Sequence, residues 1–183
     1  MKKVIGTQLM VLSVVLVLIS GVLLWAKKSS NNLSFFNYTA QATSSYDRKS
    51  ELGIPSRLRI SSVGIDLDIF PATIHGNTWE STFNGVSHLS TTPFPGDAGN
   101  SVLYGHNWES LLGPLTEVNV YDTIEVMYDQ GEVKKFKVVD VRTVSSNEIS
   151  ILDQTEDIRL TVYTCSGFLD TKRFVVTALA VQN

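Results

Sequence analysis

The only cysteine of the chain, Cys165, stands eight residues before Arg173 near the C-terminal end. Leu160–Thr164 is rich in β-branched and aromatic side chains and predicts a strand that ends at Cys165, and Lys172–Val181 predicts a second strand. The connection Ser166–Lys172 is short enough to join antiparallel strands, so Cys165 and Arg173 are expected to face each other at about 5 Å. A nearby guanidinium favours the thiolate, which is the nucleophilic form. The pattern indicates thiol chemistry; the alternative is a buried core cysteine beside an unrelated surface charge.

The three histidines, His75, His88 and His106, are too far apart in the sequence to indicate a site by themselves. His106 follows the predicted strand Ser101–Tyr104. His75 precedes Gly76 and Asn77 and is expected in a turn. His88 is expected to have a structural role.

The region from Ile54 onward contains short segments with strand character, separated by turn signals such as Asp129-Gln130-Gly131. These segments predict an all-β barrel or sandwich, and on an alternating strand Val102, Tyr104 and His106 would share one face, as would Thr161, Tyr163 and Cys165. The further segments are Arg57–Ile60, Ile65–Phe70, Tyr121–Tyr128, Val133–Val141 and the short Ile149–Asp153.

The N-terminal region contains an uncharged run, Val4–Ala26, flanked by lysines on both sides. At ~1.5 Å per helical residue this run would span ~34 Å, enough for a hydrocarbon core of ~30 Å. A cleaved signal peptide would have a shorter apolar region with a small-residue cleavage site close behind it. The sequence therefore favours an uncleaved membrane anchor over residues 1–28, a polar linker over residues 29–53 and a catalytic domain over residues 54–183.

Charge separates the same parts of the chain. Residues 1–28 hold four lysines and no acidic residue, whereas the remainder has 11 basic and 18 acidic residues, a formal net charge of −7. An acidic domain of this kind argues against a nucleic-acid surface. The single cysteine excludes an internal disulfide and a cysteine-rich zinc site.

The order and spacing of several motifs resemble the sortases, the membrane-anchored cysteine transpeptidases of bacterial surfaces. The motifs are Arg57-Leu58-Arg59-Ile60 with Val63-Gly64-Ile65, Gly85-Val86-Ser87-His88-Leu89, Gly99-Asn100-Ser101-Val102-Leu103-Tyr104-Gly105-His106, Leu160-Thr161-Val162-Tyr163-Thr164-Cys165 and Lys172-Arg173-Phe174-Val175-Val176-Thr177-Ala178. The Cys165 motif looks like the family signature TLxTC. The resemblance covers the whole predicted domain and implies a closed eight-stranded barrel of the sortase type, mostly antiparallel.

The resemblance also implies a reaction. Cys165 would attack an LPxTG-like sorting motif of a surface protein, His106 would act as acid and base, and Arg173 would stabilise the oxyanion. An amine acceptor, either a cell-wall precursor or a pilin lysine, would take the acyl group, and no cofactor is implied. Tyr104, Tyr163 and Thr164 are the candidate substrate-binding residues, and barrel packing is the alternative role for the tyrosines. The catalytic domain is expected outside the cell membrane.

Two departures bear on the subclass. Tyr121-Asp122 stands where the family often has Gly-Asp, and Leu112 stands where an aromatic is common. The short connection between Cys165 and Arg173 resembles the smaller class D, E or F enzymes. Two other functions stay open: a thiol hydrolase on the same scaffold, and a non-catalytic surface domain that binds a partner.

Overall fold

The computed structural model describes residues 13, 15–22, 52–75 and 78–181 and divides the chain into two compact units, Met1–Asn32 and Leu33–Asn183. In the first unit, residues 15–22 are helical and their side chains are exposed. Most of the predicted anchor, Val4–Ala26, and nearly all of the predicted linker lie outside the described residues. No helix within those described ranges has the length and apolar character needed to cross a membrane.

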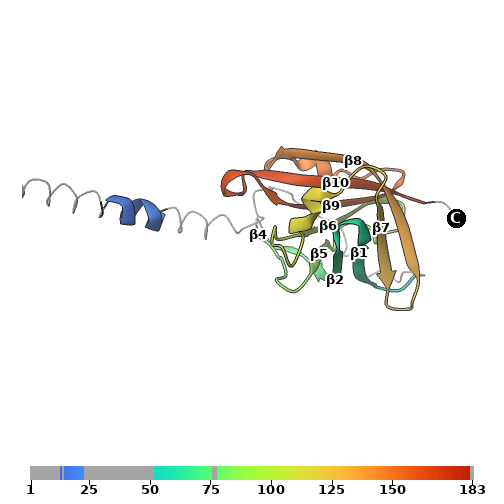
Figure 1. Ribbon diagram of the computed structural model, residues 1–183. Helices are drawn as coiled ribbons and strands as arrows, with labels where there is room; N and C mark the ends of the chain where they lie inside the picture. The colour runs from blue at the N-terminus through green and yellow to red at the C-terminus, as the bar shows by residue number, and fades with distance from the viewer. Residues whose placement is uncertain (1–12, 14, 23–51, 76–77, 182–183) are drawn as a thin grey trace, which may run out of the picture. The chain divides into compact units, whose positions relative to one another are not determined.

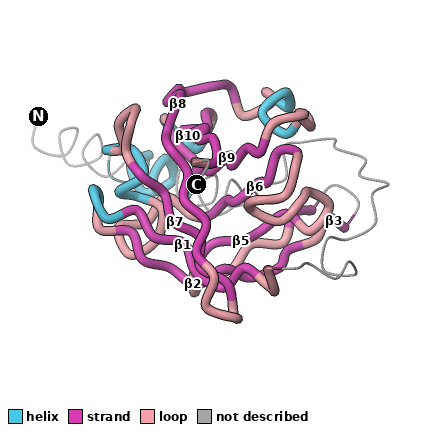
Figure 2. Tube along the Cα trace, turned by 90° about the vertical axis from the view of Figure 1, so that its right-hand side faces the viewer, coloured by secondary structure: helices cyan, strands magenta, loops and turns pink. Residues whose placement is uncertain are grey.

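The second unit contains a closed barrel of eight strands in the order β1-β2-β5-β6-β9-β10-β8-β7 (Figures 1 and 2). Two of its pairings, β2 with β5 and β6 with β9, are parallel, and the others are antiparallel. The closed all-β barrel expected from the sequence is confirmed. The barrel strands are β1 Pro55–Ile60, β2 Ile65–Ala72, β5 Val86–Leu89, β6 Gly99–Gly105, β7 Thr123–Tyr128, β8 Val133–Ser145, β9 Ile158–Ser166 and β10 Lys172–Ala180.

The connections carry short elements. β3 (Ile74–His75) and β4 (Thr78–Trp79) form a separate two-stranded sheet. The 3-10 helices are η2 Ser61–Val63, η3 Gly113–Glu117, η4 Ile149–Leu152 and η5 Phe168–Asp170.

The barrel strands bury side chains on both faces at β6, β9 and β10. Leu103, Val162 and Val176 belong to the interior core. Because successive side chains of a strand point to opposite faces, Tyr104 and Tyr163 belong to a second cluster on the outer face. That outer cluster also contains Val102, Cys165 and Val175 from the strands, Trp79 from β4, and Ile151 and Leu152 from η4. The connections β3–β4 and η4 therefore cover the outer side of the strands that carry the candidate site.

Two segments differ from the sequence-based expectation. In the predicted strand Ile149–Asp153, residues Ile149–Leu152 form η4 instead, because the Glu148 side chain accepts a hydrogen bond from the Ser150 backbone N–H and Asp153 N donates to the Ser150 carbonyl. β8 continues to Ser145, beyond the predicted end, because its last residues pair with the start of β10.

Tyr121 has a φ of 75°, in the left-handed region for which glycine is the usual residue. The Tyr121 backbone N–H donates to the Val138 carbonyl over 2.9 Å, and the Lys137 ammonium donates to the Tyr121 carbonyl. The turn at Tyr121-Asp122 therefore keeps a glycine-like backbone without a glycine.

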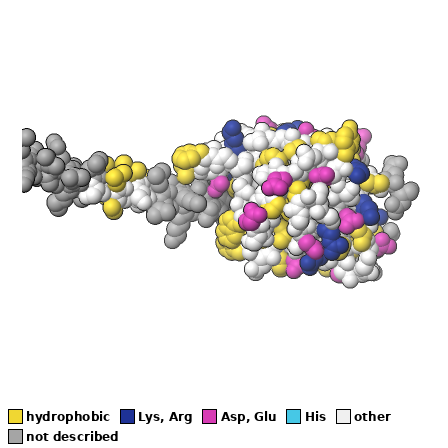
Figure 3. Space-filling view, viewed as in Figure 1, with side chains coloured by type: hydrophobic (Ala, Val, Ile, Leu, Met, Phe, Trp, Pro, Cys, Tyr) yellow, Lys and Arg dark blue, Asp and Glu magenta, His cyan; other side chains and the backbone are white. Residues whose placement is uncertain are grey.

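Charges are mixed on the visible face of the second unit. Figure 3 shows acidic side chains scattered over this face with basic ones among them. The ion pairs include Arg57 with Asp66 and Arg159 with Asp157.

Candidate active site

Cys165 and Arg173 are direct cross-strand partners in the antiparallel pairing of β9 and β10, as the sequence predicts. Both side chains are buried, with 7% of Cys165 and 1% of Arg173 exposed. The Arg173 guanidinium donates through Nη1 to the carbonyls of Asp170 and Lys172, at 2.8 Å each. Its Nε has no hydrogen-bond partner within the described part of the chain. Two loop carbonyls therefore hold the guanidinium at Nη1, while Nε–H is left to donate to another acceptor.

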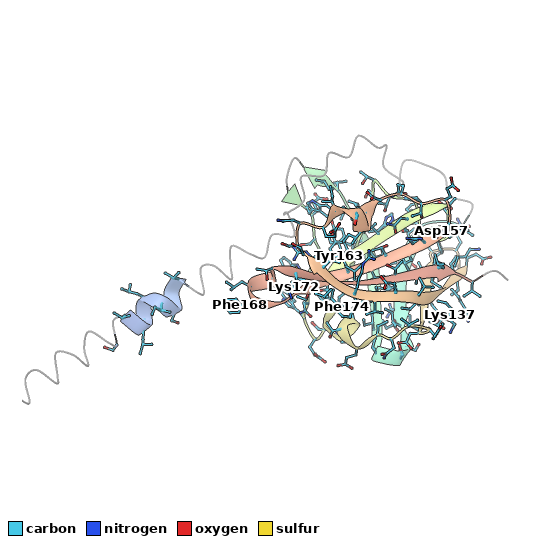
Figure 4. The ribbon with its side chains drawn as sticks, turned by 90° about the horizontal axis from the view of Figure 1, so that it is seen from above. Lys137, Asp157, Tyr163, Phe168, Lys172 and Phe174 are labelled. Atoms are coloured by element: carbon cyan, nitrogen blue, oxygen red, sulfur yellow. The ribbon has the colours of Figure 1, made fainter. Side chains whose placement is uncertain are left out.

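The β9–β10 loop owes its tight path to three residues with positive φ. Gly167, Leu169 and Asp170 have φ values of 75°, 53° and 59°. Two of them are not glycine, so this loop holds local strain next to the candidate site. Phe168 is 78% exposed and lies at the end of this hairpin, next to Lys172 (Figure 4). The loop conformation turns the Asp170 carbonyl toward Arg173.

His106 follows the last residue of β6. In the parallel pairing of β6 with β9, Gly105 stands beside Thr164, so His106 comes level with Cys165. The His106 carbonyl accepts a hydrogen bond from Leu112 N over 3.1 Å. A Cβ atom on Gly105 would come within 3.2 Å of the Leu112 side chain, so Gly105 allows the close packing that fixes this turn.

The His106 ring is held by neighbours that the sequence did not single out. Ser81 Oγ lies 3.3 Å from His106 Nε2. The rings of Phe83 and Trp108 each stack on the imidazole at a centroid distance of 4.9 Å. Trp108 stands only two residues after His106, and this short spacing is the one feature of the sequence that could have indicated a contact with the His106 ring. Phe83 and Ser81 come from a different connection and are brought in by the fold.

Burial decides the protonation state of the thiol. It raises the pKa of Cys165 to about 11, although the Arg173 charge acts in the opposite direction and the Asp170 charge adds to the rise. The sequence left open whether Cys165 is reactive or a buried core cysteine, and the structure shows a buried thiol opposite an arginine that is buried as well. The physical reason is the outer cluster, which extends over the end of β9.

Burial also lowers the pKa of the His106 imidazole, while the Asp170 carboxylate acts in the opposite direction. At neutral pH the resting pair is therefore a thiol and a neutral imidazole. Thiolate with imidazolium is a minor form that carries the same total number of protons.

The three candidate substrate-binding residues have different environments. The Tyr104 and Tyr163 rings stack at 5.5 Å, both fully buried on the outer face that carries Cys165. The Tyr104 hydroxyl donates to the Glu80 carbonyl. Thr164 donates instead to the Gly105 carbonyl over 2.9 Å and, by alternation along β9, faces the opposite side from Cys165. The two tyrosines thus lie in the same cluster as the thiol, whereas Thr164 joins the ends of β6 and β9 through its side-chain hydrogen bond.

The other two histidines lie elsewhere. His88 is fully buried in β5, with its Nε2 3.0 Å from the Pro93 carbonyl, and burial lowers its pKa to about 4. His75 is in β3. The prediction that His75 lies in a turn is therefore wrong, and its neighbours Gly76 and Asn77 lie outside the described residues.

A hollow of about 470 Å³ lies beside the segment that carries Ser81 and Phe83. This hollow therefore borders the residues that contact His106. Its lining consists of Pro71, Ala72, Glu80, Ser81, Thr82, Phe83, Asn84 and Ser87.

The closed barrel, with a thiol, a guanidinium and an imidazole gathered at the ends of β6, β9 and β10, defines a β-barrel protein with a candidate thiol site. The sortase domain model matches residues 58–181. The chain belongs to the sortase family, a family of cysteine transpeptidases.

One curated relative is the sortase A of Listeria monocytogenes serovar 1/2a. It is 30% identical over 139 residues, which cover 74% of this chain and 59% of the relative, so the chain spans less than two thirds of that protein. The crystal structure of Listeria monocytogenes sortase A has a TM-score of 0.60 at 26% identity, covering 71% of this chain and 88% of the other.

Two further solved structures share the fold. A Clostridium perfringens sortase D5 transpeptidase has a TM-score of 0.61 at 18% identity, covering 75% of this chain and 84% of the other. The complex of Streptococcus agalactiae sortase C1 with MTSET has a TM-score of 0.63 at 19% identity, covering 89% and 90%. Members of three sortase classes thus match with nearly equal scores.

Proposed function

We propose that this chain is a transpeptidase that cleaves an LPxTG-like sorting motif and transfers the acyl part to an amine. The observation that carries the proposal is the direct cross-strand pairing of Cys165 with Arg173, with His106 level with Cys165 directly after the end of the neighbouring strand β6. The short β9–β10 connection supports assignment to the small class D, E or F enzymes.

In the first half of the reaction, the Cys165 thiolate attacks the carbonyl carbon of the motif's threonine. The C–N bond breaks, His106 imidazolium gives its proton to the leaving amine, and a thioester remains. In the second half, His106 takes a proton from the incoming amine, which attacks the thioester, and the C–S bond breaks to release the Cys165 thiolate beside the His106 imidazolium. Arg173 donates to the oxyanion in both halves.

The proposed partners are surface proteins with a C-terminal sorting motif and an amine acceptor, either a peptidoglycan precursor or a pilin lysine. The test incubates the full chain, purified in mild detergent, with a library of LPxTG-like peptides, with and without a glycine or lysine amine. The expected product with amine is the ligated peptide. Absence of both cleavage and ligation with every peptide would overturn the proposal.

A thiol hydrolase would use the same residues, because water can replace the amine in the second half of the reaction. The product distinguishes the two enzymes: a free threonine carboxylate at saturating amine identifies a hydrolase. The burial of Cys165 favours a third function, a non-catalytic domain that binds a partner, in which the thiol stays unmodified by any sorting-motif peptide.

The proposed location is the outer side of the cell membrane, with residues 1–28 as a single anchor. The uncharged run Val4–Ala26 and the acidic remainder support this proposal. Protease treatment of intact protoplasts is expected to degrade a C-terminal tag. A tag that stays protected in intact protoplasts and is cut after lysis would show the opposite orientation.

The pH dependence of activity follows from the two pKa shifts. The productive pair of Cys165 and His106 carries one proton. Activity is lost at low pH when His106 is protonated while Cys165 is still a thiol, because burial lowers the His106 pKa below its usual 6.5. It is lost at high pH when the pair loses its last proton, near the Cys165 pKa of about 11. We expect kcat/KM to rise as pH increases toward 6.5 and then to stay level through pH 9. An alkaline decline centred below pH 9 would contradict the shift of Cys165.

A further inference from the structure

Two buried donors near Cys165 have no hydrogen-bond partner within the described part of the chain: the Tyr163 hydroxyl and Arg173 Nε. Tyr163 is fully buried and Arg173 is 1% exposed. Cys165 pairs with Arg173 across β9 and β10, and Tyr163 stands two residues before Cys165 on the same face. Tyr163 and Arg173 are therefore diagonal neighbours across the two strands. Such neighbours are about 7–8 Å apart, which an aromatic and a long side chain can bridge.

The comparison with Tyr104 shows that the free hydroxyl of Tyr163 is not needed for packing. The two rings stack on each other in the same cluster, but the Tyr104 hydroxyl donates to the Glu80 carbonyl. A phenylalanine at position 163 would keep the ring contacts and remove a buried polar atom that costs stability when it is unpaired. The chain thus keeps an unpaired donor where an apolar ring would serve the fold better.

The unpaired donors define what the site can accept. Tyr163 O–H and Arg173 Nε–H both donate, and the neighbouring Cys165 group is also a donor while it remains a thiol. A group that satisfies them must supply acceptors, as the carbonyl oxygens of an extended peptide do. Arg173 stands directly opposite the thiol, next to the carbonyl that would react, whereas Tyr163 lies about 6–7 Å further along β9, or two residues of extended chain.

We propose that Tyr163 is a substrate-binding residue whose hydroxyl donates a hydrogen bond to a main-chain carbonyl of the acyl-donor peptide, about two residues from the scissile bond. The proposal rests on the function proposed above and adds a polar contact that the Tyr104 ring cannot make while its hydroxyl is bonded to Glu80. Because Tyr163 shares its cluster with Trp79, Ile151 and Leu152, the entering peptide has to displace part of that cover.

The test is Tyr163→Phe in the full chain, measured for both stability and kinetics. Loss of an unpaired buried hydroxyl is expected to raise the thermal unfolding midpoint by about 2–5 °C. Loss of one neutral hydrogen bond made alike in the ground and transition states is expected to raise KM for the peptide about tenfold, with kcat within twofold. A purely structural role of Tyr163 would not give an enzyme that is more stable and yet has a higher KM for its peptide.

Tyr104→Phe is the matched control for stability, because it removes a paired hydroxyl from the stacked ring, and its unfolding midpoint is expected to fall. A lowered midpoint for Tyr163→Phe, or an unchanged KM while the wild type forms its thioester, would overturn the proposal and leave the transpeptidase function intact. A wild type that forms no thioester with any peptide overturns both.

Discussion

Cys165→Ala is expected to abolish cleavage of a sorting-motif peptide, with a loss on the order of 10⁴–10⁶ in kcat, since removal of a nucleophile has effects of this size. The variant should fold, because alanine keeps the backbone of β9 and removes only one sulfur from the outer cluster. We expect a destabilisation of about 1 kcal/mol. The measurement combines peptide cleavage, thermal unfolding and intact-protein mass spectrometry.

The mass spectrum supplies the second arm of this experiment. Wild type incubated with the peptide should show a thioester-linked adduct, and Cys165→Ala should show none. Cys165→Ser is the matched control: it keeps the size of the side chain and replaces the thiol with a far weaker nucleophile, so it should also be inactive. Residual cleavage by Cys165→Ala would mean that the thiol is not the nucleophile. A folded wild type without any adduct would favour the partner-binding domain.

The strand pairing at the centre of the site could be predicted from the sequence. Alternation along Leu160–Thr164 and the seven-residue connection are enough to put Cys165 opposite Arg173, because register in an antiparallel pair is set by the loop and the side-chain period. The same period puts Val102 and Tyr104 in one cluster on the outer face of β6, with His106 directly after the end of the strand. These are local properties, and the barrel preserves them.

The burial of the thiol could not be predicted, because it depends on segments distant in the sequence. Trp79 arrives from the β3–β4 connection and Leu152 from η4, and both belong to the cluster that contains Cys165. Desolvation by burial outweighs the Arg173 charge and raises the thiol pKa. The stacking of Phe83 on His106 has the same origin, since it joins residues 23 positions apart.

Arg173→Ala is expected to lower kcat by a factor of about 10²–10³, or ~3–4 kcal/mol of transition-state stabilisation, which is the usual effect of removing one oxyanion donor. The structure gives the reason: Nη1 is bound to the carbonyls of Asp170 and Lys172, which leaves Nε to meet the developing charge beside Cys165. The effect should appear mainly in kcat, because the charge on the carbonyl oxygen exists in the transition state and not in the bound peptide.

Arg173→Lys separates charge from geometry. A lysine keeps the positive charge. A single ammonium cannot bind both loop carbonyls and also place a donor where the Arg173 Nε–H lies, because it lacks the planar, spread-out donors of a guanidinium. Partial recovery, between the alanine variant and the wild type, is therefore expected.

Arg142→Ala is the matched control, since Arg142 is a half-exposed arginine on β8 that pairs with Asp140. Its loss should leave kcat unchanged, because exposed ion pairs contribute little. Unfolding midpoints must accompany the rates, because Arg173→Ala also leaves two loop carbonyls without their donor. A folded Arg173→Ala enzyme with kcat within threefold of wild type would show that the guanidinium holds the β9–β10 loop and takes no part in the chemistry.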